Sequence, residues 1–283
     1  MSVRRTIGRL LSCAMVGALL AGGCANAQAP LLNPAPTPAD WAALSKLPDW
    51  SGVWIPPPFA PQKTPPSWKP EIAVQVAELQ AEENAGRPRN IYVNCLPEGM
   101  PSWAIMNLST VEFLFTPGRV TILSEFDGNR LRRIYTDGRA HPDDPDLTFN
   151  GHSIGHWEDG VLVVDTVGIL PQTFLPLGQG VGIPNNGDVH IVERIGLSQP
   201  DTLRIDLVID APKVLTQPWK ISREFKRNRE RARDITEASC RQGDFIDDVD
   251  AKGNAIFTPI PHDEGGAPLP PDSPPNSPRA SAN

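Results

Sequence analysis

The sequence predicts a mainly β protein, built as an antiparallel up-and-down barrel with one short N-terminal helix and proline-rich flanks. Short apolar runs recur at regular spacing and are separated by turn residues, which is typical of barrels and sandwiches. In residues 203–209 apolar and polar residues alternate strictly, as they do in a sheet with one solvated face. Beyond residues 70–85, no stretch is long enough to supply the helices of a doubly wound fold.

The chain divides into four segments. Residues 1–27 have the order of a secretory signal peptide: arginines, an apolar core and then small residues. Residues 28–70 form an arm rich in Pro and Trp, which we expect to wrap onto the domain because its Trp side chains carry much apolar area. Residues 71–258 hold the barrel with its helix, and residues 259–283 form a Pro-rich tail whose composition favours disorder.

Two cleavage sites fit this leader. Ala25-Asn26-Ala27 matches the A-x-A rule and would release a soluble protein, whereas Cys24 ends an imperfect lipobox and would carry a lipid anchor. Either site predicts a periplasmic or secreted protein. Loss of the leader, with three arginines and no acid, takes the formal net charge from −7 to −10. Such an acidic surface disfavours nucleic acid, and it disfavours membranes except through the anchor.

The elements follow from local signals. A helix is expected over residues 70–85, where Pro70 suits the first turn and apolar residues follow at helical spacing. Strands are expected at residues 52–55, 111–115, 120–126, 130–136, 152–157, 161–167, 189–197, 203–209 and 219–225. The tripeptide Glu158-Asp159-Gly160 is a strong hairpin signal. Because short turns join sequence neighbours, the simplest topology is a meander that curls shut and removes its edges.

Two cysteines, Cys95 and Cys240, remain after processing by either route. In an oxidising compartment we expect them to form a disulfide bond. The loop that the bond closes is long, so its entropy would stabilise the fold by about 3–5 kcal/mol. The alternative, a reactive or metal-binding cysteine, has no C-x-x-C pattern to support it.

The pentapeptide GHSIG at residues 151–155 has the G-x-S-x-G pattern of a hydrolase nucleophile elbow. In an elbow the serine sits between a buried strand and a helix. Here the preceding residues are polar and the following ones enter a hairpin. We therefore predict a strand, in which the glycines allow close packing and Ser153 is incidental.

His152 and His156 lie four residues apart, a spacing that would place both on one metal ion if they were on a helix. On a strand they share a face but lie about 13 Å apart, at about 3.3 Å per residue. No shared metal site is therefore predicted. Nor is a cofactor, because the sequence has neither a P-loop nor a G-x-G-x-x-G after a strand.

Strand alternation gathers polar side chains around His152. Asp165 lies opposite in the partner strand and Glu125 in a preceding strand, so His152 with either carboxylate is a candidate acid/base set. The candidates for ligand binding are Arg133, Tyr135, His156, Glu193 and Trp219. If part of this set points inward, the barrel interior would grip a polar ligand group. The alternative is that the arginines and glutamates form ion pairs on the wet face.

Residues 130–168 contain the string R-x-I-Y-x-D-G-R, then G-H-S-I-G-x-W-E, then L-V-V-D-T. In this string the chain resembles a large group of uncharacterised exported bacterial proteins, and the likeness covers roughly residues 50–240. The resemblance implies secretion and a shared fold, and it implies no particular chemistry. The chain departs from the group's usual Gly-Asp-Thr at residues 158–161. In addition, Gly52-Val53-Trp54 resembles the G-x-W at the start of a lipocalin barrel, which implies a lipocalin-like or calycin-like architecture.

Three functions remain open. The first is a periplasmic barrel that binds an apolar or amphipathic small molecule in its interior, with His152 at the polar end of the ligand. The second is a cofactor-free isomerase, lyase or hydratase that uses His152 as general base in the same pocket. The third is an envelope interaction protein whose Trp-rich arm and Pro-rich tail contact a partner. A serine hydrolase is not expected.

Overall fold

The computed structural model describes residues 33–56, 64–85, 97–106, 110–125, 130–178, 181–237, 248–249 and 255–256. The predicted signal peptide (1–27) and tail (259–283) lie outside the described residues, and so do Cys24, Cys95 and Cys240. Export, the lipid anchor and the disulfide bond therefore stay predictions.

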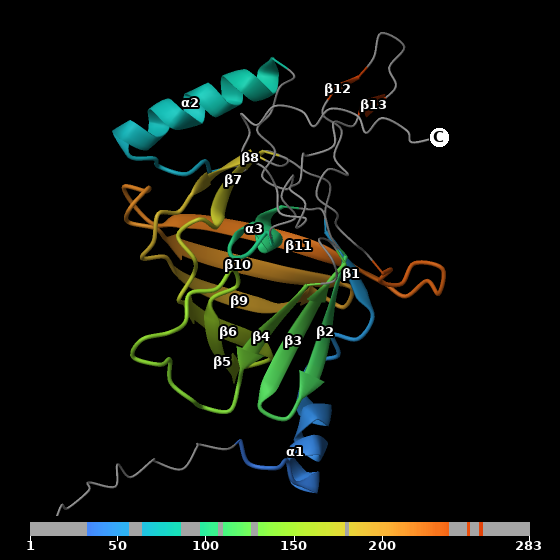
Figure 1. Ribbon diagram of the computed structural model, residues 1–283. Coiled ribbons are helices and arrows are strands. Elements are labelled where there is room, and N and C mark those ends of the chain that lie inside the picture. The colour runs from blue at the N-terminus through green and yellow to red at the C-terminus, as the bar shows by residue number, and fades with distance from the viewer. Residues whose placement is uncertain are drawn as a thin grey trace, which may run out of the picture. The chain divides into compact units, whose positions relative to one another are not determined.

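Nine strands close a barrel, in the order β1-β11-β10-β9-β6-β5-β4-β3-β2 (Figure 1). These strands are β1 (Val53–Ile55), β2 (Val111–Thr116), β3 (Arg119–Ser124), β4 (Leu131–Tyr135), β5 (His152–Glu158), β6 (Val161–Val167), β9 (His190–Gln199), β10 (Thr202–Asp210) and β11 (Trp219–Asn228). Each of the nine strands predicted from the sequence lies in this barrel. The predicted fold class is confirmed.

The remaining elements are not part of the barrel wall. They are α1 (Pro38–Ala43), the 3-10 turn η1 (Leu44–Lys46), α2 (Pro70–Asn84), α3 (Ser102–Ile105), the hairpin of β7 (Phe174–Gly178) with β8 (Val181–Pro184), and the hairpin of β12 (Asp248–Val249) with β13 (Ala255–Ile256). The predicted helix is α2, which begins at Pro70, buries Ile72 and Val76, and contacts β8. The β7–β8 hairpin was missed because prolines at positions 176 and 184 interrupt its strand pattern.

One strand pair breaks the antiparallel pattern. β4 and β5 run parallel, and only two residue pairs join them, Ile134 with Ser153 and Tyr135 with Ile154. Parallel neighbours cannot be joined by a tight turn, so residues 136–151 cross over from the end of β4 to the start of β5. The barrel is therefore mixed rather than wholly antiparallel. The side-chain alternation that predicts a strand is the same in both pairings, so it does not distinguish them.

The structure answers the question raised by the GHSIG pentapeptide. No helix follows Ser153, because β5 continues to a hairpin turn in which Asp159 has φ 47° and Gly160 φ 82°. Gly151 has φ 67°, and a Cβ there would lie 2.5 Å from the carbonyl oxygen of Val167. A Cβ on Gly155 would lie 3.0 Å from the Ile134 side chain. The predictions of a strand and of close packing at the glycines are confirmed.

Aromatic residues fill the end of the barrel at which β5 finishes. The Trp50 ring lies 5.1 Å from Phe113, 5.4 Å from Phe115 and 5.2 Å from Trp157, measured between ring centres. Trp50 is 1 % exposed, and Trp54 on β1 is fully buried. These two Trp residues of the arm are thus part of the hydrophobic core. Burial of such large side chains supplies much of a core's stabilisation.

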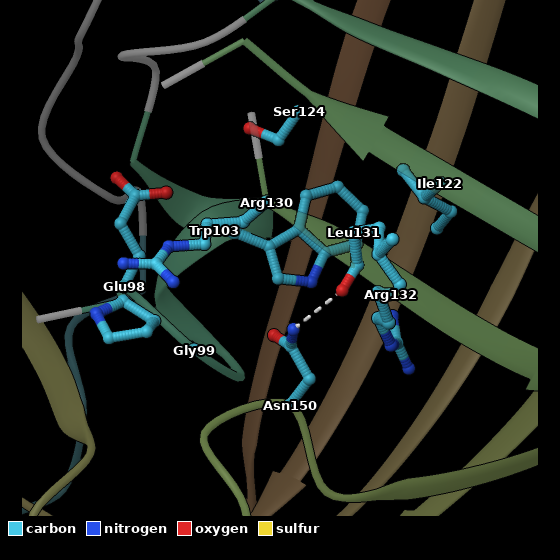
Figure 2. Close-up of a pocket in the computed structure, with 10 residues that line it drawn as sticks. Glu98, Gly99, Trp103, Ile122, Ser124, Arg130, Leu131, Arg132 and Asn150 are labelled. Carbon is cyan, nitrogen blue, oxygen red and sulfur yellow. Dashed lines mark hydrogen bonds between the residues drawn. The ribbon is translucent and has the colours of Figure 1, made fainter. Parts of the chain in front are cut away.

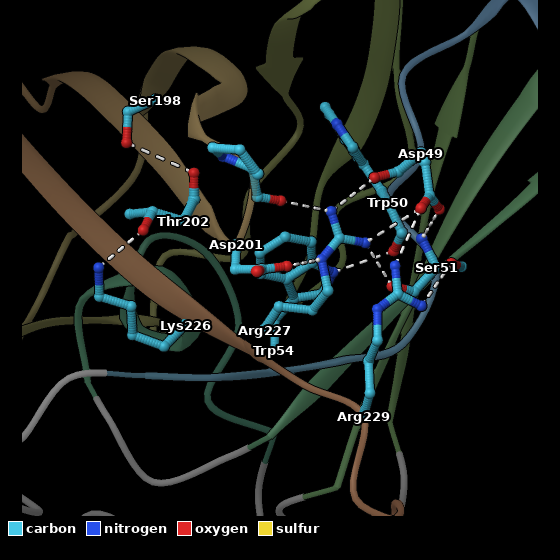
Figure 3. A network of polar contacts seen from close by, with 11 residues as sticks. Asp49, Trp50, Ser51, Trp54, Ser198, Asp201, Thr202, Lys226, Arg227 and Arg229 are labelled. Atoms are coloured by element: carbon cyan, nitrogen blue, oxygen red, sulfur yellow. Dashed lines mark hydrogen bonds and ion pairs between the residues drawn. The ribbon is translucent and has the colours of Figure 1, made fainter.

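A buried arginine clamps this end of the barrel, as Figure 3 shows. The guanidinium of Arg227 lies 4.4 Å from the ring centre of Trp54. It donates hydrogen bonds to the backbone carbonyls of Ser51 at 2.6 Å, Asp49 at 2.8 Å and Pro200 at 2.8 Å. We call this group the Arg227 clamp. It ties the arm to the turn between β9 and β10, far along the chain.

The clamp predicts a pH dependence of stability. Hydrogen bonds from Ser51, and the nearby Arg229 guanidinium, lower the pKa of Asp49 from 3.8 to about 2. A carboxyl whose pKa is lower in the folded state than in the unfolded state stabilises the fold at pH values above the unfolded pKa. This stabilisation is lost as pH falls from about 4 towards 2. The difference in unfolding free energy between wild type and Asp49→Asn should therefore shrink over that range. Urea unfolding at a series of pH values measures it.

Asp143→Asn is the control, because that exposed carboxylate takes no part in the clamp. Its acid profile should follow wild type. An Asp49→Asn difference that stays constant between pH 5 and pH 2 would contradict the assignment.

Candidate functional site

Strands β4, β5, β6 and β9 carry two separate polar groups, one on each face of the barrel wall. Ser153 is 1 % exposed and points inward, whereas His152 and His156 lie on the outer face of β5. Side chains at alternate positions of β5 therefore lie in two different environments. The polar set predicted around His152 is divided between them.

The inner group centres on a buried ion pair between Arg132 of β4 and Glu193 of β9. The side chains are 3 % and 0 % exposed. Arg132 binds both carboxylate oxygens, at 3.0 Å through Nη1 and 2.5 Å through Nη2. Nη2 also donates to the hydroxyls of Ser153 at 3.0 Å and Thr166 at 2.9 Å. A bidentate pair with further hydrogen bonds can offset the cost of removing two charges from water.

This inner network corrects two predictions. Ser153 is not incidental, because its hydroxyl joins Arg132 to Thr166, 2.9 Å away. The alternative of ion pairs on the wet face is wrong for Glu193, whose partner is inside the barrel. A second inward arginine, Arg223 on β11, is also buried, and this burial lowers the pKa of its guanidinium.

A small pocket lies beside the inner network, where α3 approaches the barrel (Figure 2). Its walls include Trp103 of α3 and Ile122 of β3, and Arg132 lies 5.6 Å from the Trp103 ring centre. The pocket has a volume of about 30 Å³. That space suits water rather than a ligand of the size of a metabolite.

The outer group is a chain of three histidines and one aspartate. Nδ1 of His152 lies 2.8 Å from Nδ1 of His141, which comes from the crossover 136–151. Nε2 of His141 lies 2.9 Å from one carboxylate oxygen of Asp165 on β6. Nε2 of His190 on β9 lies 2.8 Å from the other oxygen. We call these four residues the histidine chain.

The surroundings of His152 favour its neutral form. Burial lowers its pKa below the usual 6.5, a protonated His141 would lower it further, and the Arg139 guanidinium also lowers it. The Tyr135 ring stacks on His152, with 5.4 Å between ring centres and 26° between planes. Arg139 lies 4.0 Å from the centre of the same Tyr135 ring. His152 is therefore held as a neutral imidazole near neutral pH.

An open cleft adjoins His152 where β4 and β5 diverge. Its volume is about 600 Å³. It is lined by residues of β4, of the crossover and of the start of β5, together with Pro97: Arg130, Leu131, Arg132, Arg133, Tyr135, Pro142, Asp146, Thr148, Phe149, Asn150, Gly151, His152 and Ser153. We call it the outer cleft. Within it, the side-chain amide of Asn150 donates a hydrogen bond of 3.2 Å to the carbonyl of Leu131.

Of the predicted site residues, Arg133, Tyr135 and His152 line the outer cleft. Asp165 reaches His152 only through His141. The remaining predicted residues lie elsewhere. Glu125 accepts a hydrogen bond of 3.1 Å from the backbone of Thr236, His156 lies 2.9 Å from Glu158, and the buried Trp219 donates a hydrogen bond of 2.8 Å to the carbonyl of Thr64. The pairing of Glu125 with His152 is therefore wrong.

Sequence reasoning missed four residues of the two groups: Arg132, Thr166, His141 and His190. Arg132 lies on the same face of β4 as the core residue Ile134. The opposite face carries Leu131 and Tyr135, so it also looked apolar in the sequence. His141 stands in a polar loop between Arg139 and the acidic residues 143–146. Only the parallel pairing of β4 with β5 brings that loop to Asp165.

Nothing in the described part of the chain points to a metal or a membrane span. Among these residues, no group of three or more His, Cys, Asp or Glu is arranged to hold a metal ion. No helix there has the length and apolar character needed to cross a bilayer. Searches against models of known protein families and against curated proteins found no match to this chain.

The inner network predicts unequal costs for two neighbouring substitutions. Glu193→Gln leaves the Arg132 charge buried without its counterion, so it should lower the unfolding free energy by about 3–5 kcal/mol. Arg194→Gln, one position along β9, removes only an exposed pair with Glu158 and should cost about 1 kcal/mol or less. Urea unfolding followed by circular dichroism compares the two. Equal costs would mean that the inner pair is not buried as described.

Proposed function

We propose that this protein is exported and binds a small amphipathic molecule with an anionic group in the outer cleft. The observation that carries the proposal is the composition of the cleft wall, in which arginines and His152 lie beside apolar side chains. Sites for small molecules typically combine an apolar lining with a few polar groups that fix orientation.

Arg133 is the best residue for the anionic group. Its side chain is exposed on the outer face of β4, and it makes no hydrogen bond or ion pair with any residue that the structure describes. Because Ile134 pairs with Ser153, Arg133 and His152 are neighbours across the β4–β5 seam. A guanidinium presents several N–H donors in a planar fork that matches a carboxylate.

The apolar part of the ligand has its own surface. Leu131 is 47 % exposed, although large apolar side chains are usually buried. Phe149 and Pro142 of the crossover also line the cleft. An alkyl chain or a ring placed between these side chains would remove apolar area from water.

The outer cleft suits such a ligand better than the barrel interior does. Large aromatic residues fill one end of the interior, around Trp50. The small pocket beside the inner network has a volume of only about 30 Å³, against about 600 Å³ for the cleft. The sequence placed the ligand inside the barrel, and the proposal moves it to the outer face.

Titration with anilinonaphthalene sulfonate, a fluorescent amphipathic anion, tests this proposal. Wild type should bind the probe, and decanoate should displace it. Arg133→Gln should weaken binding about tenfold, because a charge-assisted hydrogen bond contributes about 1.5 kcal/mol. Arg204→Gln is the matched control, since Arg204 is paired with Asp206 on the outer face of β10. If Arg133→Gln binds the probe as tightly as Arg204→Gln does, the cleft is not the site.

A second candidate function is cofactor-free acid/base catalysis in the same cleft, with His152 as general base. The observation that favours it is the His152 imidazole, which lines the cleft and has its Nδ1 2.8 Å from Nδ1 of His141. Burial lowers its pKa, which favours the neutral form. A base of this kind works best when its pKa lies near the operating pH. Isomerisation, elimination and hydration all need such a proton transfer.

The lowered pKa of His152 predicts its reactivity. Diethyl pyrocarbonate modifies only neutral imidazole, so the pH of half-maximal modification should lie below the usual 6.5. Arg139→Gln removes one of the positive charges that lower the pKa, and it should move that pH upward. Peptide mass spectrometry after timed reaction measures both. A half-maximal pH at or above 6.5 in wild type would count against His152 as a base.

A further inference from the structure

The carboxylate of Asp165 limits how protons can be arranged along the histidine chain. A carboxylate accepts hydrogen bonds, so the proton between it and His141 belongs to Nε2 of His141. A neutral imidazole carries one proton, and Nδ1 of His141 is then left as an acceptor. The 2.8 Å contact between the two Nδ1 atoms therefore needs its proton from His152.

The geometry points to a tautomer relay: Asp165, acting through His141, places the proton of His152 on Nδ1 and leaves Nε2 of His152 as an unprotonated acceptor in the outer cleft. We infer that the cleft ligand is a hydroxylated carboxylic acid, with its carboxylate on Arg133 and its hydroxyl donating to Nε2 of His152. This inference rests on the proposed binding function and names the ligand class. Nε2 of His152 has no partner among the described residues, whereas the other ring nitrogen is occupied.

The histidine chain also offers a route by which a ligand proton could be taken up. If Nε2 of His152 takes the hydroxyl proton, the Nδ1 proton of His152 passes to Nδ1 of His141. His141 is then an imidazolium beside the Asp165 carboxylate, and the ligand oxygen keeps the negative charge near Arg133. One O–H bond breaks, one N–H bond forms at Nε2, and one proton moves between the two Nδ1 atoms.

His190 completes the arrangement. Its Nε2 lies 2.8 Å from the second oxygen of Asp165, so the carboxylate is held from both sides and its orientation is fixed. In this account His152 touches the ligand, whereas His141, Asp165 and His190 are positioning residues. The groups that face His152 are Tyr135, Arg139 and His141.

NMR of the imidazole nitrogens in the full-length protein tests the relay without a ligand, because it reports which ring nitrogen carries the proton. At a pH at which both rings are neutral, His152 should be the Nδ1–H tautomer and His141 the Nε2–H tautomer. A His152 that carries its proton on Nε2 would overturn the inference.

Asp165→Asn should abolish the preference for these two tautomers. The Asn side chain can present either its oxygen or its NH2 group to Nε2 of His141, so the proton of His141 is no longer fixed on Nε2 and that of His152 is no longer fixed on Nδ1. Glu158→Gln is the matched control, because Glu158 is the partner of His156, on the same strand as His152. It should leave the tautomers of His141 and His152 unchanged. An Asp165→Asn protein with wild-type tautomers would refute the role of Asp165.

Ligand competition separates this inference from the proposed function. Against the fluorescent probe, wild type should prefer β-hydroxydecanoate to decanoate by about fivefold, the worth of one hydrogen bond. Asp165→Asn should lose this preference but still bind decanoate, because Arg133 is untouched. If wild type binds decanoate and β-hydroxydecanoate equally well, the inferred ligand class is wrong but the proposed binding site is still supported. If neither acid binds, the binding function fails as well.

Discussion

The parallel pairing of β4 with β5 is the constraint on which the rest of the site depends. A strand that follows a parallel neighbour must return to the same end of the barrel, so residues 136–151 cross the outside of the wall. Only two residue pairs join β4 and β5, and beyond them the strands diverge. The crossover carries His141 to Asp165, and the divergence opens the outer cleft beside His152. An antiparallel hairpin at this position would produce neither feature.

Only a short pairing joins β4 to β5, and it is stabilised from inside the barrel. Arg132 of β4 binds Glu193 of β9 and Ser153 of β5, so one side chain links strands that share few or no backbone hydrogen bonds. A buried polar network, which holds the strands, thus adjoins a solvent-facing cleft, and Arg132 and Ser153 of the network also line that cleft. Strand alternation explains why His152 and Ser153, adjacent in the chain, belong to different polar groups. At the far end, the Arg227 clamp and the aromatic cluster close the barrel.

Most of the fold could be predicted from the sequence, because alternation and turn residues are local signals. The hairpin turn at Asp159 and Gly160 is an example, since a type I′ turn needs two residues with positive φ. The site was harder to predict. Alternation shows which residues share a face of a strand but not which face is buried. Because apolar residues occupy both faces of β4, the sequence could not show that Arg132 points inward and Arg133 outward. The partnership of His141 with Asp165 depends on a crossover that leaves no periodic signal.

We propose that function resides on the outer face, where β4 meets β5, and not in the barrel interior. A crystal structure of the full-length protein with β-hydroxydecanoate tests this proposal. The account predicts ligand density in the outer cleft, with the carboxylate on Arg133 and the hydroxyl at Nε2 of His152. Ligand density inside the barrel, among Trp50, Phe113 and their neighbours, would contradict it.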